Sequence, residues 1–195
     1  TINSKKSTYI RDGFKPIIPE NTKIIDLKLD NEILTINFSK EFLTVNETNE
    51  EPMLEALIYS LTELKEIKKI KILVENIPFT KLPNSNKKLP EYLDKTYGIN
   101  KIYNLNSLKE TSKTTIYYLS KINDYYYYVP VTKVSNEKLE RVEIIIKELK
   151  STPIYHTNLI SYLKASANMT NYELLENAIS LSFNNYLIAN MKEEQ

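Results

Sequence analysis

The stretch that most constrains the fold is residues 23–77, because the spacing of its apolar residues changes from every second position to a helical spacing and back. Apolar and charged side chains alternate through residues 23–30, which is the period of a half-buried strand. Asn31 and Glu32 then favour a two-residue turn, and the alternation resumes in residues 34–38. The pattern predicts two strands joined by a tight turn.

A helix is predicted next, over residues 52–67, with Pro52 in its first turn. Its apolar side chains share one half of the helical cylinder, and a strand predicted over residues 69–74 follows it. A helix with so broad an apolar face has to cover something, and the adjacent sheet is the obvious surface. We therefore expect Leu57 and Leu61 in the core, with the other members of this face: Met53, Leu54, Ile58, Leu64 and Ile67.

Three pieces of this stretch match a known family in order and spacing. They are residues 34–43 (LTINFSKEFL), 57–64 (LIYSLTEL) and 69–75 (KIKILVE). Together they resemble the GerM domain of bacterial sporulation and germination proteins. One departure is Asn76, where the family usually has Gly after the last strand. Asn tolerates left-handed backbone geometry, so we expect the turn to be kept.

Residues 78–112 change character, since prolines and polar residues dominate them. The stretch is longer than most loops inside compact domains, so we predict a linker between two modules. Residues 114–119 and 125–133 then indicate a hairpin with a loop of about five residues. Pro130 restricts the second of these runs to an edge strand or a bulge.

A second helix is predicted over residues 137–150. Ser135 or Asn136 can cap it, and Pro153 stops it. We expect its buried face to consist of Leu139, Val142, Ile145, Ile146 and Leu149.

The end of the chain repeats the opening. Aligned without gaps, residues 13–34 fall on residues 158–179, and residues 181–188 echo residues 36–43 in apolar rhythm. The resemblance to the GerM domain also covers this half, because residues 115–133 are similar to its opening hairpin and the helix after them is similar to its first helix.

The resemblance implies two tandem GerM-like modules, both incomplete. Residues 1–77 would form the first, lacking its opening hairpin and first helix, and residues 113–195 the second, lacking its last helix and strand. The core of the family resembles the ring-building motif of secretion-system rings. We therefore expect an α+β fold with helices packed on small mixed β-sheets. Both halves keep clean apolar faces, so we expect them to complete one another, within a chain or by self-association of two copies.

The amino-acid composition argues against several kinds of function. The net charge of +1 argues against a dedicated nucleic-acid binder. The chain has no Cys, which excludes disulfides and thiolate metal sites, and it has one His and two Gly. We therefore expect no metal and no cofactor. The hydrophobic content of 42% suffices for a core, so the chain is not of the disordered class.

The sequence also bears on compartment. No apolar run approaches the roughly 20 residues of a membrane-spanning helix, and no signal peptide is visible. Thr1 is not a natural initiator, so we expect an upstream segment. Members of the family are commonly lipoproteins. The resemblance thus implies an extracytoplasmic protein that meets the membrane only through an N-terminal lipid anchor on a Cys absent from this sequence.

The unusual feature is the run of tyrosines from Tyr125 to Tyr128. Tyr is a strong strand former and alternate residues of a strand face opposite sides, so the ordinary interpretation is a two-sided sheet edge with aromatic cross-strand pairs. The alternatives are a stacking platform and a protein interface. Ile144 is expected to face away from the buried side of its helix, where it would anchor an assembly surface. The candidate interaction surface is therefore Tyr125, Tyr126, Tyr127, Tyr128 and Ile144.

No catalytic motif stands out. His156 has no recognisable nucleophile constellation near it, so we expect a surface or hydrogen-bonding role. The carboxylates Glu137, Glu140 and Glu148 lie among cationic residues on the predicted helix, so mutual ion pairing is expected.

By resemblance, the protein is a non-catalytic component or assembly factor of the envelope-spanning complex between mother cell and forespore, with other sporulation proteins as partners. A module that binds cell-wall glycan through the tyrosine strand is the alternative. A hydrolase with acids that no motif reveals is the third hypothesis.

Overall fold

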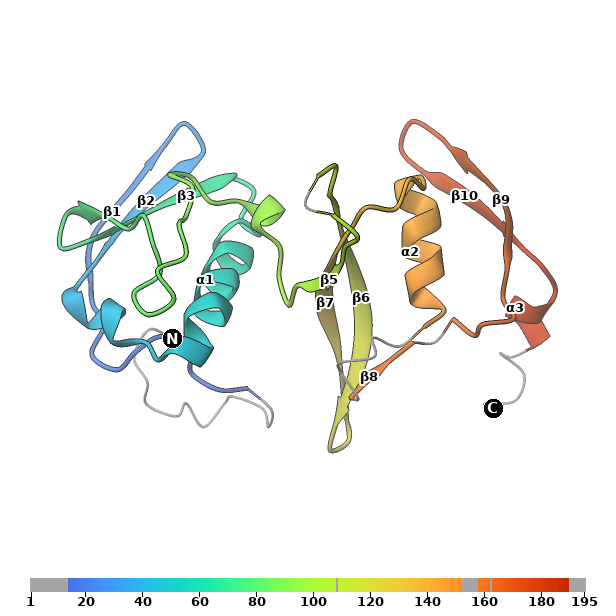
Figure 1. The fold of residues 1–195 in the computed structure, drawn as a ribbon, viewed down its shortest axis with the longest axis horizontal. Coiled ribbons are helices and arrows are strands. Elements are labelled where there is room, and N and C mark those ends of the chain that lie inside the picture. Colours follow the sequence, from blue (N-terminus) through green and yellow to red (C-terminus); the bar gives the residue numbers. More distant parts are fainter. Residues whose placement is uncertain (1–13, 108, 152–157, 162, 190–195) are drawn as a thin grey trace. The chain divides into compact units, whose positions relative to one another are not determined.

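The computed structural model describes residues 14–107, 109–151, 158–161 and 163–189. The chain divides into two compact units, Thr1–Asn100 (unit 1) and Lys101–Gln195 (unit 2). Both units combine short helices with small sheets, and each has a sheet of mixed strand direction (Figure 1). The predicted α+β fold class is confirmed.

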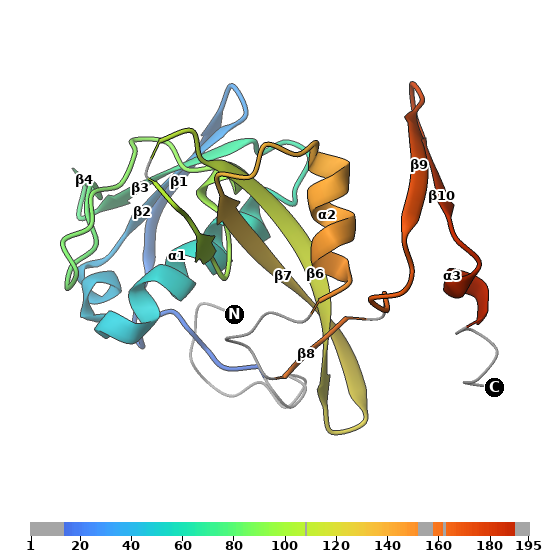
Figure 2. The ribbon, with the colours of Figure 1, turned by 45° about the vertical axis from the view of Figure 1, so that its right-hand side comes forward.

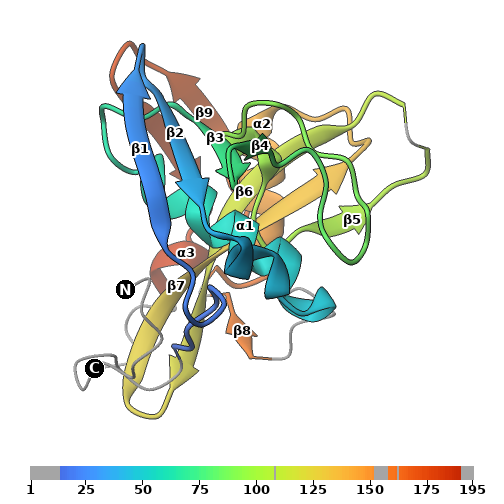
Figure 3. The same ribbon diagram turned by 90° about the vertical axis from the view of Figure 1, so that its left-hand side faces the viewer.

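Unit 1 is built on a sheet with the strand order β1-β2-β3-β4. Antiparallel β1 and β2 lie side by side, and β3 pairs in parallel with β2 (Figure 3). The predicted two-residue turn between the first two strands is confirmed, with positive φ at Asn31 and Glu32, as a type I′ turn requires. The strands are β1 (Ile24–Asp30), β2 (Ile33–Phe38), β3 (Lys69–Val74) and β4 (Ile77–Pro78).

The turn between β3 and β4 is also kept. Glu75 and Asn76 have φ angles of 51° and 66°, so Asn76 does adopt the left-handed geometry expected of it. Its backbone N–H donates to Oδ1 of Asn37 at 3.0 Å, and its own Oδ1 accepts from Nδ2 of Asn37 at 2.8 Å. These two hydrogen bonds join the β3–β4 turn to strand β2.

Helix α1 (Glu47–Leu61) is the crossover that the parallel pairing of β2 and β3 requires. A short 3₁₀ helix, η1 (Lys40–Thr44), precedes it. Asn46 caps α1, because its side chain accepts from the backbone N–H of Asn49 at 3.1 Å. The predicted start at Pro52 is therefore wrong, and Pro52 lies inside the helix.

The core of unit 1 lies between α1 and the inner face of the sheet. Met53, Leu54 and Ile58 of α1 are completely buried. Leu57 and Leu61, which the sequence places in the core, are only half-buried at its margin. The sheet and loops complete the core with Leu34, Ile36, Phe38, Phe42, Ile70, Ile72 and Val74.

Residues 79–100 belong to unit 1, so the linker predicted over residues 78–112 is wrong. Leu82 and Leu93 are buried in the core of unit 1. Leu93 also exchanges backbone hydrogen bonds with Ile70 of β3, at 2.8 and 2.9 Å. The Pro- and Asn-rich segment is therefore an ordered part of unit 1 that packs on its core.

The buried carboxylate of Glu50 fastens this segment to α1. Its oxygens accept from the backbone N–H groups of Asn84 at 2.9 Å and Ser85 at 2.8 Å, and from the side-chain amide of Asn84 at 3.0 Å. Burial acts to raise the pKa of Glu50, but the hydrogen bonds from Ser85 and Asn84 outweigh it and hold the pKa below its usual value. A short 3₁₀ helix, η2 (Lys95–Tyr97), precedes the unit boundary.

Unit 2 opens on a sheet with the strand order β5-β7-β6-β8. The long antiparallel hairpin β6–β7 pairs along its whole length and turns at residues 123–124, with positive φ at Asn123. The turn thus has two residues where the sequence predicts about five. The strands are β5 (Ile102–Asn104), β6 (Ser112–Ile122), β7 (Tyr125–Ser135) and β8 (Leu159–Ile160).

Helix α2 (Arg141–Leu149) packs on one face of this hairpin. It begins later than predicted because Glu140 and Glu143 form a capping box, each side chain accepting from the backbone of the other. Of the two expected caps, Asn136 instead bonds Asn106, Ser107 and Lys109, and Ser135 remains in β7.

Unit 2 ends with a separate hairpin of β9 (Met169–Leu174) and β10 (Ile179–Phe183), followed by the short helix α3 (Tyr186–Ala189), as Figure 2 shows. This hairpin matches β1–β2. The pair Met169–Phe183 corresponds to Ile24–Phe38, and each hairpin has one irregularity at the same point of its register. The internal repeat predicted from apolar rhythm is present in the backbone.

Candidate functional site

Strand alternation divides the four consecutive tyrosines between two faces of β6–β7. Tyr126 and Tyr128 lie on the face opposite α2, together with Tyr117, and all three are exposed. Tyr125 and Tyr127 lie on the other face, where Tyr125 is exposed and Tyr127 is half-buried. The four tyrosines of the candidate interaction surface therefore belong to two separate faces of the hairpin.

The face opposite α2, with Tyr117, Tyr126 and Tyr128, is here called the tyrosine face. Lys121 belongs to it, with its ammonium 5.6 Å from the centre of the Tyr126 ring, a cation–π distance. Tyr128 is 77% exposed, the largest value among the exposed large hydrophobic side chains of the described residues. Tyr126 and Tyr128 lie near the turn of the β6–β7 hairpin, whose backbone is shown in Figure 1.

Pro130 lies in the part of β7 that does not pair with β5. It lies opposite Tyr117 of β6, whereas β5 pairs with β7 only at Lys133–Ser135. A residue without an N–H tolerates such an edge position. The expectation that Pro130 marks an edge is confirmed.

Ile144 is not a surface anchor. It is 2% exposed and is, with Ile146, one of the buried residues of α2. The prediction is wrong because it assumed a single buried face that includes Leu139. In the structure, Leu139 precedes α2 and is exposed, and the side of α2 that carries Ile144 also carries Glu148, which bonds Lys133 of the sheet.

A buried cation that the sequence did not single out joins α2 to the sheet. Nζ of Lys133, on β7, bonds Oε1 of Glu137 at 2.8 Å and also bonds Glu148. Lys147 adds a bond to Glu137 at 2.7 Å. Ion pairing of Glu137 and Glu148 was expected from the sequence, but with cations on the helix alone.

The charges in this network are mutually stabilised. Burial acts to lower the pKa of Lys133, but hydrogen bonds to Glu137 and Glu148 outweigh it and raise the pKa. Hydrogen bonds from Lys133 and Lys147 lower the pKa of Glu137. Nearby, burial and then the charge of Glu148 raise the pKa of Tyr118 to about 12, and its hydroxyl donates to the backbone carbonyl of Glu148 at 3.3 Å. These ion pairs hold α2 against the sheet, and the group of Lys133, Glu137 and Glu148 is here called the Lys133 clamp.

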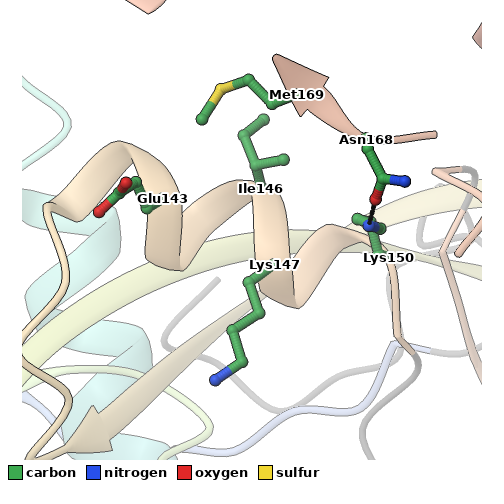
Figure 4. Close-up of a pocket in the computed structure, with 6 residues that line it drawn as sticks. All are labelled: Glu143, Ile146, Lys147, Lys150, Asn168 and Met169. Atoms are coloured by element: carbon green, nitrogen blue, oxygen red, sulfur yellow. Dashed lines mark hydrogen bonds between the residues drawn. The ribbon is translucent and has the colours of Figure 1, made fainter. Parts of the chain in front are cut away.

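A shallow pocket of about 270 Å³ lies between α2 and the start of β9 (Figure 4). Its polar groups are engaged by the protein: Lys150 donates to Asn168, Lys147 pairs with Glu137, and Glu143 completes the capping box. The lining residues are Glu143, Ile146, Lys147, Lys150, Asn168 and Met169. A pocket whose polar groups are already paired is a weak candidate for a ligand site.

Apolar side chains are exposed on both repeated hairpins. In unit 1, Leu27 and Leu29 of β1 share a face with the buried side of β2 but remain about half exposed. In unit 2, Leu174, Ile179 and Leu181 are exposed on β9–β10. These side chains form the open faces of the two hairpins, and the sequence predicted only that such strands would be half-buried.

Within the described ranges, no group of three His, Cys, Asp or Glu residues is arranged to hold a metal ion. Among the helices that the structure describes, none has the length and apolarity needed to cross a membrane. His156 lies outside the described residues.

Comparisons with known proteins agree on one family. Residues 2–80 match the model "Germane: Sporulation and spore germination". The chain is 25% identical over 192 residues to spore germination protein GerM of Bacillus subtilis (strain 168), and the match covers 96% of this chain and 52% of that protein. The chain thus spans about half the length of this curated relative.

A solved structure shows the same fold over most of the chain. It is described as the tandem GerMN domains of the sporulation protein GerM from Bacillus subtilis. The TM-score is 0.84 at 24% identity, covering 91% of this chain and 64% of that one. The fold of this chain is therefore similar to that of a tandem pair of GerMN domains.

Proposed function

Because the chain is a GerM-domain family protein, we propose that it is a non-catalytic sporulation or germination protein that acts by binding other proteins. Homology to GerM supports a sporulation-related role. The relatives are named for sporulation and germination and not for an enzymatic activity. The finer role proposed is that of a component or assembly factor of the envelope-spanning complex between mother cell and forespore.

The observation that carries this proposal is the pair of open apolar faces. Leu27 and Leu29 of β1 remain about half exposed although their partners on β2, Ile36 and Leu34, are buried, and Ile179 and Leu181 of β10 are also exposed. Contiguous exposed apolar surface on a small domain is characteristic of protein interaction sites. A tandem arrangement would present one such surface on each unit.

The proposed compartment is extracytoplasmic, with the longer protein anchored as a lipoprotein. The chain has no Cys, so Asp124→Cys in the exposed β6–β7 turn gives the described domain a single thiol. A membrane-impermeant maleimide should label it in intact sporulating protoplasts while the space between mother cell and forespore is still open to the medium, whereas a cytoplasmic thiol protein stays unlabelled. At that stage, labelling that appears only after permeabilisation would contradict the proposed location.

Partner binding is tested by crosslinking in sporulating cells, followed by purification of the tagged longer protein. We expect envelope proteins of sporulation to copurify. The double change Leu27→Lys and Leu29→Lys should reduce their recovery, whereas Asp26→Lys on the other face of the same strand should not. Equal recovery with both variants would remove the open face of β1 as an interaction surface.

A second candidate function rests on the tyrosine face. Exposed aromatic rings on one side of a hairpin, flanked by Lys121, form a flat stacking surface that suits sugar rings. Titration with soluble peptidoglycan fragments, followed by NMR of the tyrosine rings, separates this function from protein binding. Saturable shifts of Tyr126 and Tyr128 would favour glycan binding, and unchanged spectra would reject it.

A further inference from the structure

The tyrosine face carries rings that the core of unit 2 does not use. Strands β6 and β7 pair residue for residue along their whole length, so the backbone under this face is regular. The buried cluster around Ile116 and Tyr118 lies on the other face of the hairpin. Tyr117 and Tyr128 are 56% and 77% exposed, so burial in the core does not explain why tyrosines occupy these positions.

Pairing between tyrosines does not explain them either. Within residues 112–135, all of which the structure describes, no tyrosine lies directly opposite another tyrosine. The aromatic cross-strand pairs expected from the sequence are therefore not formed at directly opposite positions, and the rings remain open to a ligand. On the tyrosine face the opposed pairs are Tyr117–Pro130, Tyr128–Leu119 and Tyr126–Lys121.

The charge on the tyrosine face is of one sign. Across the described strands β6 and β7, the residues of this face include Lys113 and Lys121 and no Asp or Glu. Asp124 in the turn is the nearest carboxylate along the chain, but among the described residues it forms no ion pair with Lys121. The ammonium of Lys121 lies over the Tyr126 ring instead, so its charge is available to an anion.

Another exposed sheet face of the same chain differs in this respect. The face of the unit 1 sheet that points away from the core carries Asp26, Lys28 and Asp30 in alternate positions of β1, and Lys69 and Lys71 on β3. Both signs of charge are mixed there, as is usual for a solvated surface. The tyrosine face, with rings and cations alone, has the composition of a binding surface for an anion.

We propose that the tyrosine face binds an acidic glycan, which is an extended chain of sugar rings that carries carboxylate groups at intervals. Sugar rings stack on Tyr128 and Tyr117, and the ammonium of Lys121 pairs with a carboxylate of the chain. This deepens glycan binding, the second candidate function, on which it rests, by naming the charge of the ligand and the residue that selects it.

The geometry of the hairpin suits such a ligand. Successive pairs on one face of a strand are about 7 Å apart, so the rings of Tyr126, Tyr128 and Tyr117 follow one another along the hairpin. The face of an aromatic ring is electrically negative, and it attracts the C–H groups on the flat side of a sugar ring. An extended chain of sugars can therefore contact successive tyrosines.

The ratio of rings to charges separates this ligand from other anionic polymers. Near the turn, the tyrosine face offers three exposed rings and one ammonium, that of Lys121. Nucleic acid carries a phosphate at every nucleotide and is bound mainly through several cations at once. An acidic peptide without rings would pair with Lys121 and leave the tyrosines without a stacking partner.

The test uses the full chain and two forms of one ligand. Soluble peptidoglycan fragments are titrated as they are and after their carboxylates have been converted to amides, and NMR follows the tyrosine rings. Saturable shifts are expected at Tyr117 and Tyr128 with both forms. Amidation should weaken the binding about fivefold, because it removes the partner of Lys121.

Two pairs of variants assign the roles. Tyr128→Thr should weaken the binding about tenfold through loss of stacking, whereas Tyr125→Thr, on the opposite face of the same strand, should not. Lys121→Met should abolish the preference for the unmodified fragments. Lys138→Met, which changes an exposed lysine outside the hairpin, should keep that preference.

Several outcomes would overturn the inference. Equal affinity for unmodified and amidated fragments would leave glycan binding standing and remove the acidic ligand. Unchanged tyrosine signals with both forms would remove glycan binding as well. Shifts as large with polyglutamate or with oligothymidylate would assign the face to an acidic peptide or to nucleic acid, and equal losses from Tyr128→Thr and Tyr125→Thr would remove the tyrosine face as the site.

Discussion

Asn168 and Asn184 close the β9–β10 hairpin through two hydrogen bonds. The backbone N–H of Asn184 donates to the carbonyl oxygen of Asn168 at 3.0 Å, and Oδ1 of Asn184 accepts from the N–H of Asn168 at 3.2 Å. In unit 1, Ser39 makes the same two bonds with Lys23, at 2.9 and 3.0 Å. Asn184 and Ser39 therefore make equivalent hydrogen bonds at equivalent positions of the repeated hairpin.

This equivalence predicts a substitution pattern at Asn184. Asn184→Ser should keep the closing bond, because serine makes it in unit 1. Asn184→Ala should lose it and lower the local free energy of opening by about 1 kcal/mol. Amide exchange of Asn168 measures the difference. Equal protection in both variants would mean that the side-chain bond contributes nothing.

The buried face of α1 gives a second prediction. Leu54→Ala and Ile58→Ala remove completely buried side chains, so each should cost about 2–5 kcal/mol of unfolding free energy. Leu57→Ala, at the margin of the core, should cost clearly less. Amide exchange in β3 reports on unit 1. A larger loss from Leu57→Ala than from Leu54→Ala would contradict the helix orientation.

Glu50 predicts a pH dependence. Its pKa is lower in the folded chain than in the unfolded one, so it stabilises unit 1 above its ordinary pKa, and this stability is lost as the pH falls through the lowered value. Glu50→Gln should cost about 1–3 kcal/mol at neutral pH, because the amide cannot accept all the bonds that the carboxylate accepts.

Urea unfolding of the wild type and of Glu50→Gln, from neutral pH down to acid pH, checks this sign. The gap between the two proteins should narrow as the pH falls below the usual glutamate range. A gap that widens on acidification would show that burial, and not hydrogen bonding, dominates at Glu50.

The Lys133 clamp gives a fourth prediction. Lys133→Met leaves Glu148 without its cation and should cost about 2 kcal/mol, between the values for exposed and fully buried pairs. Lys147→Met removes a more exposed partner and should cost less than about 1 kcal/mol. Adding Glu148→Leu to Lys133→Met should restore stability, and a further loss instead would argue against the clamp.

Much of the fold could be predicted from local patterns. The alternation in β1 and β2, the left-handed turn residues and the repeat of this hairpin in unit 2 are all visible as spacing. Helix ends were harder, because Asn46 and Glu140 act through capping bonds that compete with other candidates. The segment containing Leu82 and Leu93 reads as a loop because its two buried leucines are isolated and show no period.

The candidate site, too, could be predicted only in part from the sequence. The tyrosine run predicts a two-sided strand, and its rings do divide between two faces, but the alternation alone does not say that Tyr126 and Tyr128 lie on the side opposite α2. The prediction for Ile144 failed because it assumed one buried face, whereas α2 buries both Ile144 and Ile146, which lie on different sides of the helix. Lys133 could not be predicted, since only the tertiary fold brings its strand to the carboxylates of Glu137 and Glu148.

The central claim is that the chain acts through the open apolar faces of its hairpins. A photo-crosslinking amino acid placed at Leu27 of β1, with Asp26 as the opposite-face control, tests it in sporulating cells. The account predicts protein adducts from position 27 and far fewer from position 26. Equal adducts from both positions, or none from position 27 while the protein is stably present, would contradict it.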